Sequence, residues 1–271
     1  MATNFTKELR LRPGEKVDLS KYDANETLGW QKDHKMKSSL KKALEKLDYL
    51  QYVLYAERKR AILIVLQGLD TAGKDGTIRH VMSGVNPQGC KVTSFKAPAG
   101  AETEHDFLWR VHNAIPAYGE IGIFNRSHYE DVLVVRVHNL APKEVWSKRY
   151  DEINEFESIL HRNNVHILKF FLYISKDEQK ARLLDRVDDP DKHWKISEAD
   201  FNERKFWSEY HAAYEDALSK CNSDIAPWYI IPSNKKWFRN LAVSHIVAES
   251  MERLDLKFPK PTVDLKKLKF S

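Results

Sequence analysis

The stretch that decides the fold is AILIVLQGLDTAGKDGT, residues 61–77. It opens with six apolar residues, which are rich in β-branched side chains and too few to span a membrane. Such a run predicts a buried parallel strand, here leading directly into a glycine-bearing turn. Apolar residues then recur at helical spacing at Ile78, Val81 and Met82. The stretch therefore predicts a strand, a tight turn and a helix in direct succession.

The turn has the spacing G-x-x-x-x-G-K, formed by Gly68, Gly73 and Lys74. In such a P-loop the backbone N–H groups surround phosphate oxygens, the lysine adds a positive charge, and a helix N-terminus lies behind. A glycine-rich turn with a chance lysine is the alternative, and the flanking strand and helix make it the weaker one. We predict that the following residues bind phosphate: Gly68, Thr71, Ala72, Gly73, Lys74, Asp75, Gly76 and Thr77.

The residue after the lysine departs from the usual pattern. Nucleotide-binding P-loops place a serine or threonine hydroxyl there to hold Mg²⁺. This chain instead has Asp75, and it carries a second carboxylate, Asp70, inside the loop. We therefore expect the metal to be held differently, with Asp70 as one of its ligands.

The charge of the chain is unevenly distributed. Its 271 residues carry a net charge of +5 and are 42% hydrophobic, enough for one full α/β core. Residues 1–60 hold 14 Lys or Arg against 9 Asp or Glu, which leaves 30 against 30 for residues 61–271. Since the larger part is balanced, we expect no nucleic-acid partner.

The cysteines and the apolar segments indicate the compartment. Cys90 and Cys221 lie far apart, in no metal-binding or redox spacing, which predicts a reducing environment. The first residues lack the apolar segment of a signal peptide, and no run approaches the roughly 20 apolar residues of a membrane helix. We expect a cytoplasmic protein with no membrane partner.

Apolar runs predict five strands, at residues 61–66, 90–95, 119–124, 165–174 and 228–231. Helical patterns lie between them, at residues 104–114, 142–163, 201–218 and, after the last strand, 238–254. This alternation predicts an α/β fold in three α/β/α layers, with a five-stranded, mainly parallel sheet.

The chain ends show two further patterns. Residues 1–33 have no sustained period and predict an arm on the surface, whereas residues 34–60 predict a helix that docks on the core. The apolar face of that helix consists of Met36, Leu40, Leu44, Leu47, Leu50 and Leu54. We divide the chain into an arm and docking helix at 1–57, a P-loop domain at 58–255 and a basic tail at 256–271.

Polar residues follow the third predicted strand, in the segment NRSHYED at 125–131. Ligands bind at the carboxyl ends of the strands in open parallel sheets. We therefore expect Asn125 and Arg126 to face the same crevice as Lys74.

Arg182 and Arg186 lie four residues apart, hence on one face of a helix. A charged excursion follows, and Ser197 with Asp200 resembles a capping box that starts another helix. We predict a helical lid at about residues 182–200 that brings both arginines to phosphate. The alternative is a solvated helix face, on which these arginines pair with Glu178 and Asp185.

Together these residues suit phosphoryl transfer, which needs positioned phosphates, Mg²⁺ and cations near the transferred group. Arginine serves because its planar fork binds phosphate bidentately and keeps its charge. The predicted catalytic residues are Asp70, Lys74, Arg126, Arg182 and Arg186.

Three motifs in order resemble the polyphosphate kinase 2 family. They are GLDTAGKDG at 68–76, NRSHYED at 125–131, and RLLDR at 182–186 followed by DPDKHWK at 189–195. The resemblance covers roughly residues 35–255. It implies a fold similar to thymidylate kinase and an oligomeric cytoplasmic enzyme. The implied activity is reversible phosphoryl transfer between inorganic polyphosphate and adenine or guanine nucleotides, dependent on Mg²⁺ with Mn²⁺ as an alternative.

The resemblance assigns roles residue by residue. Asp70 matches the loop carboxylate at the metal, Lys74 the phosphate-binding lysine, and Arg126 the arginine of the second motif. Arg182 and Arg186 match the lid arginines. We predict metal ligation by Asp70, Asn125 and Glu130, and nucleotide contacts from Asn125, Arg126, Glu130 and Arg136.

Asn125 is a departure, because much of the family has a metal-binding aspartate there. The asparagine form resembles a subgroup thought to phosphorylate both nucleoside mono- and diphosphates. We therefore expect AMP and ADP, with GMP and GDP as further acceptors, to give ADP and ATP or their guanine counterparts.

Polyphosphate carries about one charge per phosphate and has no base, so backbone N–H groups, lysine and arginine suffice to bind it. We predict a tunnel lined by Lys74, Lys91, Lys96 and the basic residues of the lid. The expected partners are polyphosphate, AMP, ADP, ATP and further copies of this chain, in a dimer or tetramer. An ATP-dependent P-loop nucleotide kinase and a non-enzymatic polyanion binder remain as alternatives.

Overall fold

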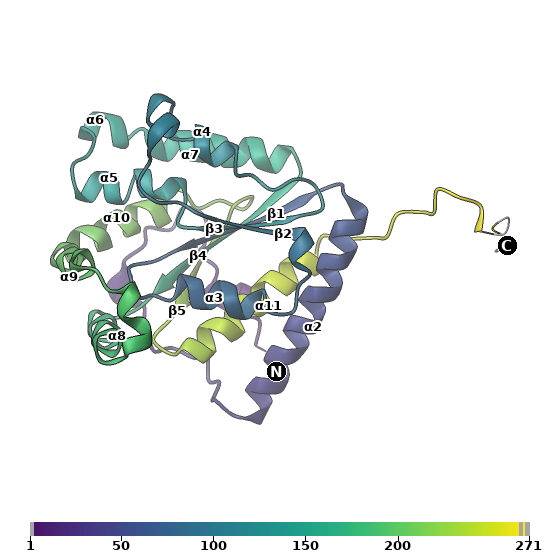
Figure 1. Cartoon of the computed structure of the whole chain (residues 1–271), viewed down its shortest axis with the longest axis horizontal. Coiled ribbons are helices and arrows are strands. Elements are labelled where there is room, and N and C mark those ends of the chain that lie inside the picture. Colours follow the sequence, from purple (N-terminus) through teal and green to yellow (C-terminus); the bar gives the residue numbers. More distant parts are fainter. Residues whose placement is uncertain (1–2, 266–267, 269–271) are drawn as a thin grey trace.

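A five-stranded sheet forms the centre of the computed structural model, which describes residues 3–265 and 268 (Figure 1). Its strand order is β2-β3-β1-β4-β5, and every neighbouring pair is parallel. The strands are β1 (Ala61–Gln67), β2 (Cys90–Ser94), β3 (Ile121–Asn125), β4 (Val165–Tyr173) and β5 (Trp228–Pro232). The five predicted strands and their parallel pairing are confirmed.

Helices cover both faces of the sheet (Figure 1). One face carries α4 (Trp109–His112), α5 (Val134–Val137), α6 (Lys143–Trp146), α7 (Arg149–Arg162) and α10 (Trp207–Lys220). The other carries α1 (Phe5–Leu9), α2 (His34–Glu57), α3 (Lys74–Val81) and α11 (Lys236–Glu252). Alternate residues of β1 enter the two cores, Leu63 and Val65 on one side, Ile62 and Ile64 on the other. The three-layer prediction is confirmed.

The register of the sheet brings the two predicted ligand-binding segments together. Leu66 near the end of β1 pairs with Asn125 at the end of β3. The P-loop and the segment after Asn125 therefore leave the sheet side by side, at its carboxyl edge.

The predicted lid lies at this same edge. Helix α8 (Lys176–Asp188) is followed by a 3₁₀ segment, Pro190–Lys195, and by α9 (Glu198–Glu203) (Figure 1). The predicted capping box is present, since Ser197 accepts from the Asp200 N–H and the Asp200 carboxylate accepts from the Ser197 N–H.

Three helix predictions were wrong in extent. Residues 104–114 form only the short α4, and the Asp106 carboxylate accepts from the Leu108 N–H in a turn that precedes it. Residues 142–163 divide into α6 and α7, so Val145 and Ile159 do not share one buried face and are exposed. Residues 201–218 are interrupted by a 3₁₀ turn at Arg204–Phe206.

The prediction of a surface arm at residues 1–33 was wrong for its apolar residues. Phe5 and Leu19 are fully buried, and the segment around Arg10 bridges Tyr229 on the edge strand β5. Phe5 and Leu19 lie in the five-residue helix α1 and in the 3₁₀ turn Leu19–Lys21, segments too short to show a sustained hydrophobic period in the sequence. The arm thereby covers one edge of the sheet.

The docking helix forms α2 as predicted. Met36, Leu47, Leu50 and Leu54 are buried, while Leu40 and Leu44 are partly buried.

The chain beyond α11 was predicted as a basic tail at 256–271, of which residues 266–267 and 269–271 lie outside the described residues. Phe258 contacts the rings of Tyr49 and Tyr52 on α2, and the chain then leaves the body of the molecule (Figure 1).

Two properties of the chain concern its environment. Burial raises the pKa of the Cys90 thiol to about 11 and of the Cys221 thiol to about 12, so both stay protonated at neutral pH. Within the described residues, no helix combines the length and apolar character needed to cross a membrane.

Candidate active site

The backbone of the P-loop folds around the side chain of Lys74. The Lys74 Nζ donates to the Gly68 carbonyl oxygen at 2.6 Å, and burial lowers the pKa of Lys74. Thr71 and Gly73 adopt positive φ angles of 66° and 103°. A Cβ at Gly68 would lie 2.8 Å from the Leu172 carbonyl oxygen, so this position requires glycine. The loop is therefore tightly turned, with its amino group inside.

Arg182 supports this loop from beneath. Its Nη1 donates to the carbonyls of Thr71 and Ala72 at 2.9 and 3.2 Å, and its Nη2 donates to those of Ser233 and Asn234 at 2.5 and 2.9 Å. Its Nε donates to the Glu178 carboxylate at 2.7 Å. All five N–H groups are thus used, and Arg182 is 6% exposed. Arg182 therefore holds the backbone of the P-loop and also lines the cavity in front of it, and its predicted part in catalysis stays a prediction.

Arg186 lies one helical turn further, where α8 meets the lid. Its Nη1 is 3.6 Å from the Asp200 carboxylate and 3.5 Å from the Lys195 carbonyl oxygen. The alternative pairing predicted for these arginines holds for Arg182 with Glu178, whereas Arg186 pairs with Asp200 instead of Asp185.

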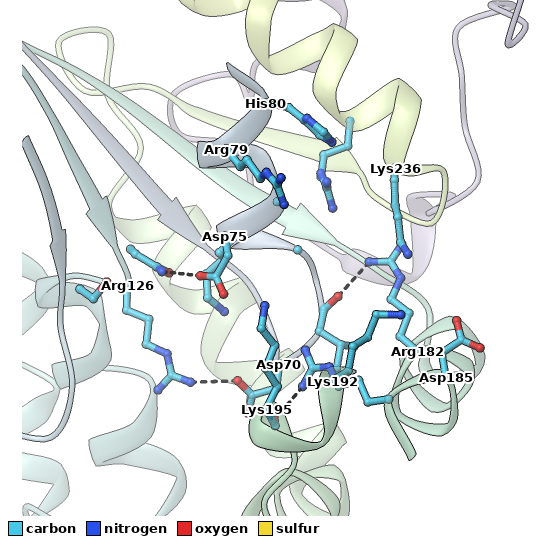
Figure 2. Close-up of a pocket in the computed structure, with 18 of the residues that line it drawn as sticks. Asp70, Asp75, Arg79, His80, Arg126, Arg182, Asp185, Lys192, Lys195 and Lys236 are labelled. Atoms are coloured by element: carbon cyan, nitrogen blue, oxygen red, sulfur yellow. Dashed lines mark hydrogen bonds and ion pairs between the residues drawn. The ribbon is translucent and has the colours of Figure 1, made fainter. Parts of the chain in front are cut away.

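Two polar pairs lie at the carboxyl edge of the sheet (Figure 2). The Arg126 Nη2 donates to the Asp70 Oδ1 at 2.9 Å, and the Asn125 Nδ2 donates to the Asp75 Oδ1 at 2.8 Å. Burial raises the pKa of Glu130, against the opposing effect of Arg126 and Lys74. Although burial opposes it, the carboxylates of Glu130 and Asp70 raise the pKa of Arg126. The P-loop and the second motif are thus in direct contact, as the sequence predicted.

A strongly basic cavity of about 840 Å³ opens in front of the P-loop. Ten Lys or Arg side chains line it, against three Asp. The basic residues are Lys74, Arg79, Lys96, Arg126, Arg182, Arg186, Lys192, Lys195, Lys236 and Arg239. Figure 2 shows Arg79 and Lys236 on the opposite side of this cavity from Lys192 and Lys195 of the lid. The cavity therefore suits an extended polyanion.

A second cavity, of about 690 Å³, has the opposite character. Four carboxylate residues line it, namely Asp70, Glu130, Asp200 and Glu203. Its wall includes the aromatic rings of Trp207, Tyr210 and Tyr214. Asp70 and Arg126 line both cavities, so their ion pair marks the place where the two meet.

Most of the predicted phosphate-binding residues reach the basic cavity. Thr71, Gly73, Lys74, Asp75, Gly76 and Lys96 line it. Gly68 lines the second cavity instead, and Ala72 is buried below the loop. The Thr77 hydroxyl donates to the Gly73 carbonyl within the helix, at 3.0 Å, and is buried.

Lys91 and Arg136 lie outside the two cavities, and their predicted contacts with phosphate and nucleotide stay predictions. Lys91 pairs in register with Gly122, near the start of β2, so it lies away from the carboxyl edge. The Arg136 Nη1 is 2.6 Å from the Asp216 carboxylate and 3.2 Å from the Tyr150 hydroxyl, and it lines neither cavity. Its helix α5 turns this side chain toward α10.

Several lining residues escaped the sequence analysis. Asp200 was predicted only as a helix cap, and Trp207, Tyr210 and Tyr214 only as part of the helix at 201–218. Arg239 lies on α11, whose sequence is largely apolar. A single arginine among apolar residues was the one feature of the sequence that could have indicated its place at the cavity.

Comparison with known proteins identifies the family. The profile of the family described as Polyphosphate kinase 2 (PPK2) matches residues 30–259. This chain belongs to the polyphosphate kinase 2 family. A relative in Meiothermus ruber, named AMP/ADP-polyphosphate phosphotransferase, is 47% identical over 263 residues, which cover 97% of this chain and 98% of the relative. One in Rhodopseudomonas palustris, named ADP-polyphosphate phosphotransferase, is 46% identical over 269 residues, or 95% and 93% of the two chains.

A solved structure shows the same fold. The crystal structure of Polyphosphate Kinase 2 from Arthrobacter aurescens TC1 superimposes with a TM-score of 0.93 at 41% identity, covering 98% of this chain and 95% of that one. The P-loop kinase-like α/β fold predicted from the sequence is confirmed.

A buried ionic network supports the second motif of the chain. The Lys169 Nζ donates to the Glu157 carboxylate at 2.6 Å and to the Tyr129 hydroxyl at 2.8 Å. The Tyr129 hydroxyl in turn donates to Glu157 at 2.9 Å. Lys169 and Tyr129 are fully buried, and Glu157 is 2% exposed. This network fixes the segment that follows Arg126.

The metal ligands predicted from the sequence do not form a closed cage in the described residues. Among residues 3–265 and 268, no group of three or more His, Cys, Asp or Glu is arranged to hold a metal ion. Asp70 and Glu130 line the second cavity together, whereas Asn125 lines the basic one. Such a sparse oxygen set fits Mg²⁺, which proteins hold with one or two carboxylates plus substrate phosphates.

Proposed function

We propose that this chain transfers phosphoryl groups from inorganic polyphosphate to AMP and ADP, giving ADP and ATP. The observation that carries the proposal is the Asp70–Arg126 pair, which lies between a basic and an acidic, aromatic-lined cavity. A donor and an acceptor of different chemistry can meet there. The names of the M. ruber and R. palustris relatives support the choice of donor and acceptor.

The basic cavity is the proposed donor site. Polyphosphate carries about one negative charge per phosphate and no base, so it needs many cations and few directional contacts. The cavity supplies an excess of seven positive charges, from ten Lys or Arg against three Asp. Binding should therefore weaken steeply as the salt concentration rises.

The second cavity is the proposed acceptor site. Its volume of about 690 Å³ lies in the usual range for small-molecule sites. The rings of Trp207 and Tyr210 offer apolar surface for a purine base, and the Asp70–Arg126 pair lies where the acceptor phosphate would meet the donor. We extend the proposal to GMP and GDP by resemblance to the family.

The reaction breaks the bond between the terminal phosphorus of polyphosphate and its bridging oxygen, and forms one between that phosphorus and an acceptor phosphate oxygen. Lys74 and the loop N–H groups hold the donor phosphates, and Arg126 lies at the junction to offset charge on the transferred group. Arg186 approaches from the lid. When bound, Mg²⁺ or Mn²⁺ would be held by Asp70 and Glu130 and would offset the negative charge of the phosphates.

Acceptor choice is attributed to Asn125. Its amide donates to Asp75, so its neutral carbonyl oxygen is left for the metal or the phosphates. An aspartate at this position would add a negative charge beside the reacting groups. We therefore assign the chain to the asparagine-containing subgroup that accepts both AMP and ADP. We also propose a homo-oligomer, a dimer or a tetramer, by resemblance to the family.

The test is a donor assay. Nucleotide products are measured from AMP and from ADP with polyphosphate as the sole phosphate source, and in parallel with ATP as the sole donor. Product from both acceptors with polyphosphate supports the proposal. If AMP is converted only when ATP is the donor, an ordinary P-loop nucleotide kinase is favoured. If polyphosphate binds but no nucleotide product forms, a polyanion-binding protein is favoured.

A further inference from the structure

Arg239 of α11 is a buried arginine at the base of the basic cavity. It is 2% exposed, yet it lines that cavity beside the P-loop. Its Nη1 donates to the Ala72 carbonyl at 3.1 Å, and its Nε and Nη2 donate to the Asn240 side-chain oxygen at 3.2 and 3.0 Å. All of these partners are neutral.

The charge of Arg239 lacks compensation. Among the described residues, no carboxylate forms a hydrogen bond or ion pair with it. Burial and the neighbouring charge of Arg182 lower the pKa of Arg239 to about 10, so it remains charged at neutral pH. A buried, unpaired charge is costly, and such groups are normally retained with a partner.

The position of the guanidinium points to the missing partner. A Cβ at Gly73 would overlap the Arg239 Nη1, and a Cβ at Gly76 would lie 3.2 Å from its Nη2. The guanidinium therefore lies directly against the backbone of the loop that cradles phosphate. This contact also gives a reason for glycine at position 76, where no positive φ requires it.

The hydrogen-bonding groups of Arg239 are not all used. A guanidinium has five N–H groups, and the contacts of Arg239 use one on each of its three nitrogens. Within the part of the chain that the structure describes, one N–H on Nη1 and one on Nη2 have no protein acceptor, on a side chain that lines the cavity. Arg182, by contrast, uses all five on protein atoms.

We propose that Arg239 is a phosphate-binding residue, whose counter-ion is the polyphosphate chain bound in the basic cavity. The inference rests on the proposed function. Arg182 then holds the shape of the loop, while Arg239 carries charge that only the bound chain balances. Removing Arg239 weakens polyphosphate binding but spares the stability of the free protein more than removing Arg182 does.

The test compares Arg239→Met with Arg182→Met as the matched control. Binding of inorganic polyphosphate of one chain length is titrated at several salt concentrations, and thermal unfolding of each free protein is recorded. Arg239→Met should raise the Kd about tenfold or more and make the slope of log Kd against log salt shallower by about 0.7 to 0.9. Arg182→Met should lower the unfolding midpoint further, since four carbonyls lose a donor.

Arg239→Lys keeps the charge without the fork. It should show an intermediate Kd with the salt slope of the wild type, and it serves if the methionine variant fails to fold. If Arg239→Met, or Arg239→Lys where the methionine variant does not fold, binds polyphosphate with both the Kd and the salt slope of the wild type, this inference is overturned and the proposed function still stands. Absence of polyphosphate binding by the wild type would overturn the proposed function, and this inference with it.

Discussion

The Nη2 atom of Arg126 lies 2.9 Å from the Oδ1 atom of Asp70, and this ion pair is shared by the walls of two cavities. Arg126 has a φ of 62°, a conformation that costs a non-glycine residue about 1 kcal/mol or more. The buried network under the segment after Arg126 holds it in place. The backbone strain at Arg126 is retained, as expected if the direction of the Arg126 side chain matters for the reaction.

The lid arginine gives the first prediction. Arg186→Lys keeps the positive charge but loses the planar fork, so turnover should fall about tenfold while nucleotide affinity changes little. Arg162→Lys on α7, remote from both cavities, is the control. Steady-state kcat and KM measure the effect, and an unchanged kcat for Arg186→Lys would return Arg186 to a purely structural role.

The second prediction concerns the buried network of Lys169, Glu157 and Tyr129. Lys169→Met leaves the Glu157 carboxylate buried without its cation, and should lower the free energy of unfolding by about 3–5 kcal/mol. Adding Glu157→Gln should recover part of that loss, because the unpaired charge is gone. Urea unfolding of the single and double variants measures both. A double variant no more stable than Lys169→Met would contradict the charge argument.

Asp131 gives a prediction on pH. Burial raises the pKa of this carboxyl from 3.8 to about 6, although Arg149 opposes the shift. A folded-state pKa above the unfolded one means that the free energy of unfolding falls as pH rises from about 4 to 6. Asp131→Asn removes this cost, so its stability relative to wild type should increase by about 3 kcal/mol at most between pH 4 and pH 7. A difference that stays constant with pH would refute the assignment.

The fourth prediction concerns the choice between AMP and ADP as acceptor. Asn125→Asp places a second carboxylate beside Asp75, which the native amide now contacts at 2.8 Å. We expect the ratio of initial rates on AMP and ADP to shift at least severalfold, with polyphosphate binding retained. Rates are compared under saturating polyphosphate and Mg²⁺. If the ratio is the same in both proteins, Asn125 does not set the acceptor.

The elements that sequence predicted well are those whose signal is local. The apolar run 61–66 and the glycine spacing of the P-loop each specify a conformation within a few residues, and both are as expected. The second motif was also placed correctly, because the carboxyl ends of parallel strands share one edge.

The contacts of the other site residues depend on tertiary packing instead. Helical spacing puts Arg182 and Arg186 on one face, but the rise of about 6 Å between them brings Arg182 to the backbone of the P-loop and Arg186 to Asp200 of the lid. Arg239 reaches the backbone of the P-loop only because α11 packs against α3, and the sequence pattern of α11 does not predict that contact.

The central claim is that the Lys74 site moves phosphoryl groups from polyphosphate to nucleotides. The most direct measurement follows AMP and polyphosphate in one sample by ³¹P NMR, with Mg²⁺ present and no other donor. We expect the β-phosphate signal of ADP, then that of ATP, in step with loss of polyphosphate. Lys74→Ala, still folded by circular dichroism, should retain at most about a thousandth of the rate. Absence of ADP with the wild type, or more than about a tenth of its rate in Lys74→Ala, would contradict the account.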